Sequence, residues 1–200
     1  MYVAAFDEAQ RLVLTDATPQ YVLQHLAAFG GRADPHPDWN ALANLPADDE
    51  LARFTAWLAQ LLASEPLTED IATLWFGLFN PTLDDGTVTL TLYLGGSRNP
   101  ASAPDVTMDY FPEGRYYPSS VLGDIYRLAY QHDDGPGNLA EYALGLGYAG
   151  SLVAHALRTL DPTLFAPGNE TRTVVVGFDS GDYVDIGTVT AEGFVPTQLA

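Results

Sequence analysis

Two segments of the chain combine β-favouring residues with strong turn signals, and each predicts an antiparallel hairpin. In the first, over residues 71–94, apolar residues fall on both faces of IATLWFGLFN, whereas TVTLTLYL alternates threonine with valine and leucine. The sequence NPTLDDG between them is typical of a turn. The second hairpin, over residues 172–190, pairs TVVVGFD with YVDIGTV around SGD. Both hairpins are expected to join one mainly antiparallel sheet.

Apolar residues at helical spacing predict about four helices. Thr18 followed by Pro19 is a favourable helix start, and Gly30 and Gly31 are typical of a helix end. Three acidic residues at 48–50 suit the first turn of the next helix, where the helix dipole favours negative charge. The four helices are expected over residues 18–29, 48–65, 119–129 and 139–160.

The last of these helices has an unusual composition. Asn138 and Glu141 resemble a capping box at its start. Gly145, Gly147 and Gly150 each cost about 1 kcal/mol relative to alanine inside a helix. Such a cost indicates that another segment approaches closely, so this helix is expected to be the buried spine of the fold.

The beginning of the chain predicts a further hairpin. Residues 2–6 and 11–14 are short β-favouring runs separated by DEAQ. Together with the later elements they give an order in which strands and helices are segregated along the chain. This order favours an α+β fold, formed by residues 1–200 as a single domain.

The charge of the chain is strongly unbalanced. There is no lysine, and eight arginines face 26 aspartates and glutamates, for a formal net charge of −18. Schiff-base catalysis and a phosphate-binding P-loop lysine are therefore excluded, and a negative surface disfavours nucleic acid and anionic lipid. Coding bias in a GC-rich genome or adaptation to salt explains the same composition. A surface suited to a basic partner is the functional alternative.

The absence of cysteine and of long apolar runs limits the chemistry and the cellular location expected of the protein. Without cysteine there are no disulfides, thiolate nucleophiles or cysteine-ligated metals. No apolar run approaches the roughly 18–20 residues that cross a bilayer, and the start MYVAAFDEAQRLVL lacks a basic segment typical of signal peptides. We expect a soluble cytoplasmic protein that binds neither membranes nor nucleic acid.

Four histidines are the ordinary candidates for a general base near neutral pH. His25 and His155 lie in predicted helices, which favours packing or surface roles. His36 in DPHPD and His132 in QHDD each adjoin aspartates, so either could serve a hydrolase that uses a divalent metal. The metalloprotease spacing H-E-x-x-H is absent, and the leading expectation is that the protein holds no cofactor and no metal.

The most distinctive local sequence is DYFPEGRYYP. It places four aromatic residues and an arginine around a turn, and tyrosine and arginine often anchor protein interfaces. These rings either fasten the loop to the core or form a recognition surface. The candidate partner-binding residues are Tyr110, Phe111, Arg115, Tyr116 and Tyr117.

These observations favour a non-enzymatic protein-binding domain that recognises a basic protein. One concrete form is an inhibitor or immunity-type protein that covers the cationic active site of a bacterial toxin. The alternative is the hydrolase that uses His36 or His132 with nearby aspartates and a divalent metal. A second alternative is a structural homo-oligomer, joined through strand edges or through the glycine face of the last helix.

Overall fold

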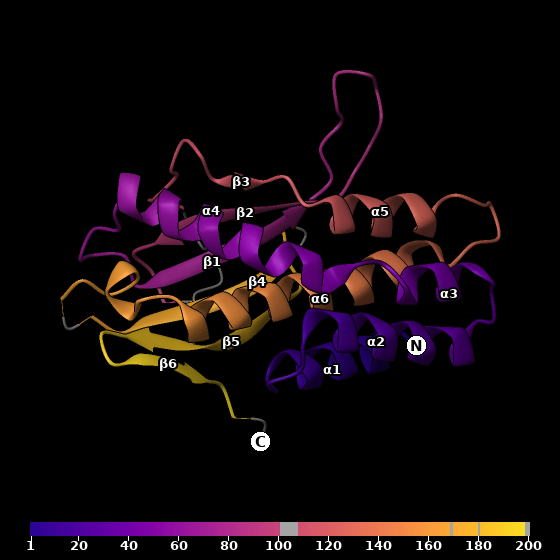
Figure 1. Cartoon of the computed structure of the whole chain (residues 1–200), viewed down its shortest axis with the longest axis horizontal. Coiled ribbons are helices and arrows are strands. Elements are labelled where there is room, and N and C mark those ends of the chain that lie inside the picture. The colour runs from indigo at the N-terminus through magenta and orange to yellow at the C-terminus, as the bar shows by residue number, and fades with distance from the viewer. Residues whose placement is uncertain (101–107, 169, 180, 199–200) are drawn as a thin grey trace.

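The computed structural model describes residues 1–100, 108–168, 170–179 and 181–198, which form six α-helices and a six-stranded sheet (Figure 1). Two 3₁₀ helices, η1 (Ala47–Glu50) and η2 (Pro162–Leu164), complete the helical part. The α-helices are α1 (Tyr2–Val13), α2 (Pro19–Ala33), α3 (Asp38–Ala43), α4 (Leu51–Ser64), α5 (Ser120–Ala129) and α6 (Gly137–Thr159). The strands are β1 (Thr73–Phe79), β2 (Thr91–Ser97), β3 (Tyr116–Tyr117), β4 (Arg172–Phe178), β5 (Tyr183–Thr190) and β6 (Gly193–Pro196).

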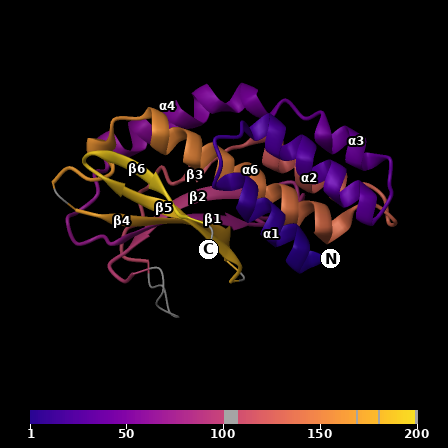
Figure 2. The same cartoon turned by 90° about the horizontal axis from the view of Figure 1, so that it is seen from below.

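The sheet has the strand order β3-β2-β1-β4-β5-β6. Its two central strands, β1 and β4, are parallel, and every other neighbouring pair is antiparallel. The two predicted hairpins are β1–β2 and β4–β5, so the prediction of an α+β fold with a mainly antiparallel sheet is confirmed. The helices lie on one side of the sheet, with α6 in contact with β1, β4 and β5 (Figure 2).

The predicted hairpin at the start of the chain is wrong, because residues 2–13 form helix α1. Its buried residues Ala5, Ala9, Leu12 and Val13 recur at helical spacing and face the core. The β-branched Val3, which favoured a strand, is exposed. The four-residue period of the small residues was the better signal.

Helix α2 begins as predicted but continues past the expected end. The side chain of Thr18 accepts a hydrogen bond from the Tyr21 backbone N–H at 3.2 Å, which caps the helix. Gly30 and Gly31 lie inside the helix and do not end it. The indole of Trp39 occupies the space beside Gly30, which explains why a residue without a side chain is found there. Trp39 belongs to α3, which forms within the segment expected to be a loop.

Helix α6 is the buried spine that its glycines predicted. A Cβ on Gly147 would overlap Leu26 of α2, and one on Gly150 would overlap Val13 of α1. This glycine face is therefore occupied within the chain, so it is not open to the homo-oligomer contact considered for it. Within the described residues, no helix is both long and apolar enough to cross a bilayer.

The predicted capping box is wrong, since α6 begins at Gly137 without a side-chain cap and Glu141 instead accepts a hydrogen bond from Asn80.

The second strand of the first hairpin was expected over TVTLTLYL, residues 87–94, but lies further along the chain. It starts at Thr91 and runs to Ser97, so Gly95 and Gly96 lie in β2 rather than in the expected loop. The additional strand considered at DVTMDYF falls largely on residues 101–107, outside the described residues. At its end, Tyr110 forms an isolated antiparallel bridge with Gly96.

A buried carboxylate joins three of the helices. Glu50, 1% exposed, precedes α4 and accepts hydrogen bonds from the hydroxyl groups of Ser119, Ser120 and Tyr148 at 2.6–2.7 Å. It also accepts the backbone N–H groups of Ser120 and Val121, which begin α5. A buried carboxylate is tolerated when its lone pairs are satisfied in this way. Glu50 thus links the start of α4, the N-terminus of α5 and the middle of α6.

The adjacent glycines of α2 provide a matched test of the Trp39 packing. We expect Gly30→Ala to destabilise the protein by about 1–3 kcal/mol, because the new methyl group displaces the indole. At Gly31 an added Cβ meets Trp39 at 3.5 Å, an ordinary contact, so Gly31→Ala is expected to stabilise by about 0.5–1 kcal/mol through reduced chain entropy. Urea denaturation measures both. Equal effects of the two substitutions would contradict this packing.

Removal of the Glu50 carboxylate leaves several buried donors without an acceptor. We expect Glu50→Ala to lower the free energy of unfolding by at least about 3 kcal/mol, since hydrogen bonds to charged groups contribute about 1.5–3 kcal/mol. Chemical denaturation monitored by circular dichroism measures this loss. The exposed Glu69 is the control, and Glu69→Ala should stay within about 0.5 kcal/mol of the parent. A comparable loss in both variants would show that the network is unimportant.

The same carboxylate makes stability depend on pH. Burial raises the pKa of Glu50, but the hydrogen bonds from Ser119, Ser120, Tyr148 and Val121 together hold the pKa below its usual value of 4.5. The stabilisation is therefore complete above that unfolded-state value and declines as pH falls through the folded-state value. We expect the acid-induced loss of stability to be shallower in Glu50→Gln than in the parent, as measured by urea titrations from pH 7 down to about pH 3.

Candidate functional site

The face of the sheet opposite the helices carries aromatic side chains. Along β1, Leu74, Phe76 and Leu78 point into the main core, so the alternating Trp75 and Phe79 point the other way. Trp75 packs in a separate cluster with Val175 of β4, flanked by Tyr93 and Met108. The sheet therefore has a helix-covered face and a second, aromatic face.

Glycines determine how these rings lie. Across the strands β3, β2, β1, β4 and β5, a continuous row of paired positions reads Tyr116, Tyr93, Gly77, Gly177 and Tyr183. A Cβ on Gly77 would overlap the ring of Tyr93, and one on Gly177 would overlap Tyr183. Because the central glycines have no side chains, the tyrosines lean over the middle of the sheet.

The rings contact one another along this face. Phe79 packs edge-on against Tyr93 at 5.7 Å and lies 5.6 Å from Tyr116, both measured between ring centroids. Tyr183 packs edge-on against Trp75 at 5.7 Å. We call the surface formed by Phe79, Tyr93, Phe111, Tyr116 and Tyr183 the aromatic face.

The five residues singled out in DYFPEGRYYP divide into two groups. Tyr117 is buried against Phe54 at 5.0 Å between ring centroids, and the hydroxyl group of Tyr110 donates to the Glu65 carbonyl oxygen at 2.5 Å. Burial raises the pKa of each tyrosine to about 12. These two rings fasten the loop to the core, which is the first of the two roles considered for the aromatic residues of this loop.

The other three residues of the loop are at the surface. Phe111 is 54% exposed and Tyr116 is 48% exposed. The Arg115 guanidinium lies 5.4 Å from the ring centroid of Phe111 and 4.6 Å from that of Tyr116, within the range of cation–π contacts. Arg115 therefore holds both rings against the edge of the sheet.

A cavity of about 260 Å³ opens where this loop meets the sheet. The hydroxyl group of Tyr93 donates to the Asp179 carboxylate at 2.8 Å, and burial together with this carboxylate raises the pKa of Tyr93. The volume falls below the roughly 300–1,000 Å³ of ordinary small-molecule sites and suits a single inserted side chain. The cavity is lined by Phe79, Tyr93, Phe111, Arg115, Tyr116 and Asp179.

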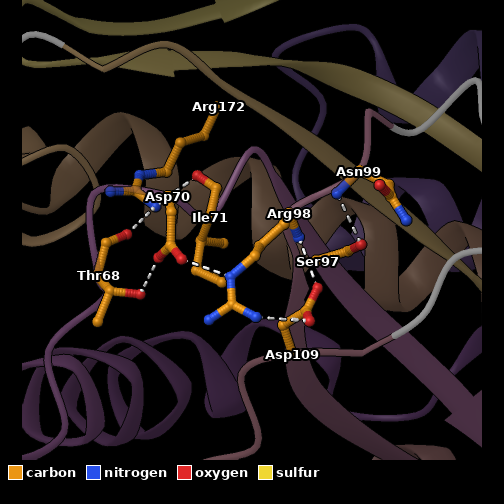
Figure 3. Close-up of polar contacts among 8 residues, drawn as sticks. All are labelled: Thr68, Asp70, Ile71, Ser97, Arg98, Asn99, Asp109 and Arg172. Atoms are coloured by element: carbon orange, nitrogen blue, oxygen red, sulfur yellow. Dashed lines mark hydrogen bonds and ion pairs between the residues drawn. The ribbon is translucent and has the colours of Figure 1, made fainter.

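The arginines of the chain are already engaged by its own side chains. Six of the eight lie within 4.0 Å of a carboxylate oxygen, and Arg32 and Arg115 lie over aromatic rings. Figure 3 shows Arg98 between the carboxylates of Asp70 and Asp109. The surplus of acidic residues is thus unbalanced elsewhere on the surface, including at Asp179.

Arg172 in the same view is fully buried. Its guanidinium Nη1 donates to the carbonyl oxygens of Thr68 at 3.1 Å and Ile71 at 2.7 Å (Figure 3). Burial lowers its pKa, while Glu170, 4.0 Å away, opposes this shift. Arg172 fastens the turn before β1 to the start of β4 and supports the sheet from one end.

The structure brings together two histidines that the sequence treated separately. His132, after α5, lies with Nδ1 2.8 Å from the Asp38 carboxylate at the start of α3, and His36 Nδ1 lies 3.4 Å from the same oxygen. The two imidazole rings are 5.8 Å apart. We call His36, Asp38 and His132 the His–Asp–His cluster. Of the other histidines, His25 pairs with Glu8 at 2.5 Å between Nε2 and the carboxylate, and His155 lies in α6.

Several residues of these sites were not anticipated. Tyr93 occupies the outer face of a clearly alternating strand, so its exposure on that face could have been inferred from the pattern. Asp179 follows β4 in a segment interpreted as a turn. Asp38 belongs to the DPHPD motif, but its contact with His132 had no sequence signal, because the two residues are 94 positions apart.

Comparisons with known proteins do not add to this geometry. No family model, no curated protein and no solved structure matches the chain.

Proposed function

We propose that this chain is a non-enzymatic binding protein that recognises a basic protein partner through the aromatic face. The observation that carries the proposal is the Asp179 carboxylate among the rings of Tyr93, Phe79 and Tyr116. A lysine or arginine of the partner would enter this cavity, pair with the carboxylate and lie against the rings. Cation–π attraction and ion pairing then act on the same group.

The shape of the surface supports a protein partner. The tyrosines project from paired strands, so little conformational entropy is lost when they are covered. Exposed aromatic residues clustered beside an arginine are typical anchors of protein interfaces. Phe111 and Tyr116 are the most exposed of these rings and are available for contact with a partner.

The charge supports a basic partner. The net charge of −18 draws cationic proteins and raises their rate of encounter, whereas it repels phosphate backbones. Aromatic platforms for single-stranded nucleic acid combine their rings with a positively charged groove. Here Arg115 is the cation among the cavity-lining residues, and it is engaged by Phe111 and Tyr116.

In its most specific form, the proposal describes an inhibitor or immunity-type protein that covers the cationic active site of a toxin. Cationic groups of such an active site would pair with Asp179 and lie against the surrounding rings. Such inhibition requires complementary charge and a rigid surface rather than catalytic groups of its own.

A random peptide library displayed on phage tests the chemistry of recognition without a known partner. We expect selection on the purified chain to enrich peptides with lysine or arginine beside an apolar residue, and binding to weaken with salt. Asp179→Asn and Tyr116→Ala should each reduce the affinity for a selected peptide at least about tenfold. Tyr21→Ala is the control, because Tyr21 is 53% exposed but lies on α2. Enrichment of acidic peptides, or equal binding by Asp179→Asn, would contradict the proposal.

Arg115 is tested separately, because it positions rings rather than contacting the core. We expect Arg115→Ala to weaken peptide binding several-fold while leaving the unfolding midpoint nearly unchanged, since exposed cation–π contacts contribute about 0.5–1 kcal/mol. Fluorescence anisotropy and thermal unfolding measure the two effects. Unchanged binding would assign Arg115 a structural role only.

A further inference from the structure

The His–Asp–His cluster lies away from the aromatic face. His36 belongs to the segment before α3, Asp38 begins α3, and His132 follows α5. In both cartoon views α3 lies at one end of the molecule and the sheet occupies the other (Figures 1 and 2). One ligand-type atom from each of the three side chains falls within 4.8 Å of the other two.

We propose that His36, Asp38 and His132 bind a divalent transition-metal ion of the zinc type. Two imidazole nitrogens and one carboxylate oxygen are the donors that zinc and its neighbours in the first row accept. Calcium and magnesium prefer six or more oxygen ligands, which this set does not provide. The proposal is independent of the function proposed for the aromatic face.

The distances agree with a metal at the centre of the cluster. Ligands about 2.0–2.2 Å from a tetrahedral zinc ion lie about 3.3–3.6 Å from one another. His36 Nδ1 and the Asp38 carboxylate oxygen are 3.4 Å apart, and His132 Nδ1 is 2.8 Å from the same oxygen. The shorter separation is a hydrogen bond whose proton the metal would replace. The ligand atoms of the two imidazoles lie within 4.8 Å of each other, so metal binding would draw the rings together while this hydrogen bond opens.

The supporting contacts hold the ligands in place. Nδ1 of His36 accepts the backbone N–H of Asp38 at 3.2 Å, which leaves that nitrogen unprotonated, the form a metal requires. Metal binding exchanges this long hydrogen bond for a coordinate bond. Trp39, next to Asp38, donates from its indole N–H to the Asp34 carbonyl oxygen at 2.8 Å and is locked over Gly30. The start of α3 is therefore fixed before a metal arrives.

The cluster is accessible on one side. Asp38 and His36 are largely buried, whereas the His132 side chain is 50% exposed. Asp134, whose carboxylate is 3.9 Å from His36 Nε2, is 91% exposed. Three protein ligands with an open side leave a coordination position for water, an arrangement that the hydrolase alternative would require.

Metal binding should also join two distant parts of the chain. Asp38 and His132 are 94 residues apart, and their contact closes the turn after α5 onto α3. A metal that binds this folded arrangement stabilises it by mass action, by an amount that grows with metal concentration. Stability therefore provides a readout that is separate from any activity.

The test uses the untagged full chain, freed of metal with a chelator and titrated with Zn²⁺ by calorimetry. We expect one equivalent to bind, and His36→Gln and His132→Gln each to lower the affinity at least about tenfold, because loss even of outer groups around a metal costs 10–100-fold. His25→Gln and His155→Gln are matched controls and should retain the parent affinity. Mg²⁺ and Ca²⁺ should not compete.

Two further measurements keep the proposal falsifiable if a variant folds poorly. The imidazole proton resonances of the four histidines should separate on Zn²⁺ addition, with two shifted and two unchanged. The unfolding midpoint of the parent should rise with Zn²⁺, while that of His132→Gln should not. Absence of stoichiometric binding by the parent, or equal binding by both groups of histidine variants, would overturn the proposal and leave the His132–Asp38 contact as an ordinary ion pair.

Discussion

The arrangement of the helices depends on one buried carboxylate, that of Glu50. Its two oxygens satisfy hydroxyl and backbone donors at the start of α5 and the hydroxyl group of Tyr148 in the middle of α6. A charge in this place is costly unless every donor around it is correctly placed, so the network specifies one position for α5 relative to α4 and α6. The turn that carries His132 follows α5, and the segment that carries Tyr116 precedes it. Each candidate site therefore includes one residue on a segment that adjoins α5.

The two faces of the sheet differ in what covers them. One face is covered by helices and forms the core, whereas the other presents rings over the central glycines Gly77 and Gly177. This leaves aromatic area at the surface of a strongly acidic protein, where a cationic partner gains from both features. The proposed metal ligands lie at the opposite end, with His36 and His132 between helices and Asp38 at the start of α3. The two proposals thus concern separate surfaces and can succeed or fail independently.

Sequence reasoning succeeded where the information was local. β-favouring residues and turn signals identified both hairpins, and Thr18 indicated the start of α2 correctly. It failed at α1, where β-branched and aromatic residues outweighed the four-residue spacing of buried alanines. The contact of Asp38 with His132 could not be predicted, because it depends on how α3 and α5 pack. In the aromatic loop, residue types identified the place, but packing decided that Tyr117 is buried and Tyr116 exposed.

The parallel pairing of β1 with β4 has a consequence for the order of folding. Each hairpin is local, but Thr73 pairs with Thr173, and such distant contacts form late because a long loop must close first. Gly77 and Gly177 meet across this last junction. The aromatic face is consequently completed only when the two halves of the sheet have joined. During synthesis, a chain that has not yet formed β4 cannot present it, so partner binding would report on a fully assembled protein.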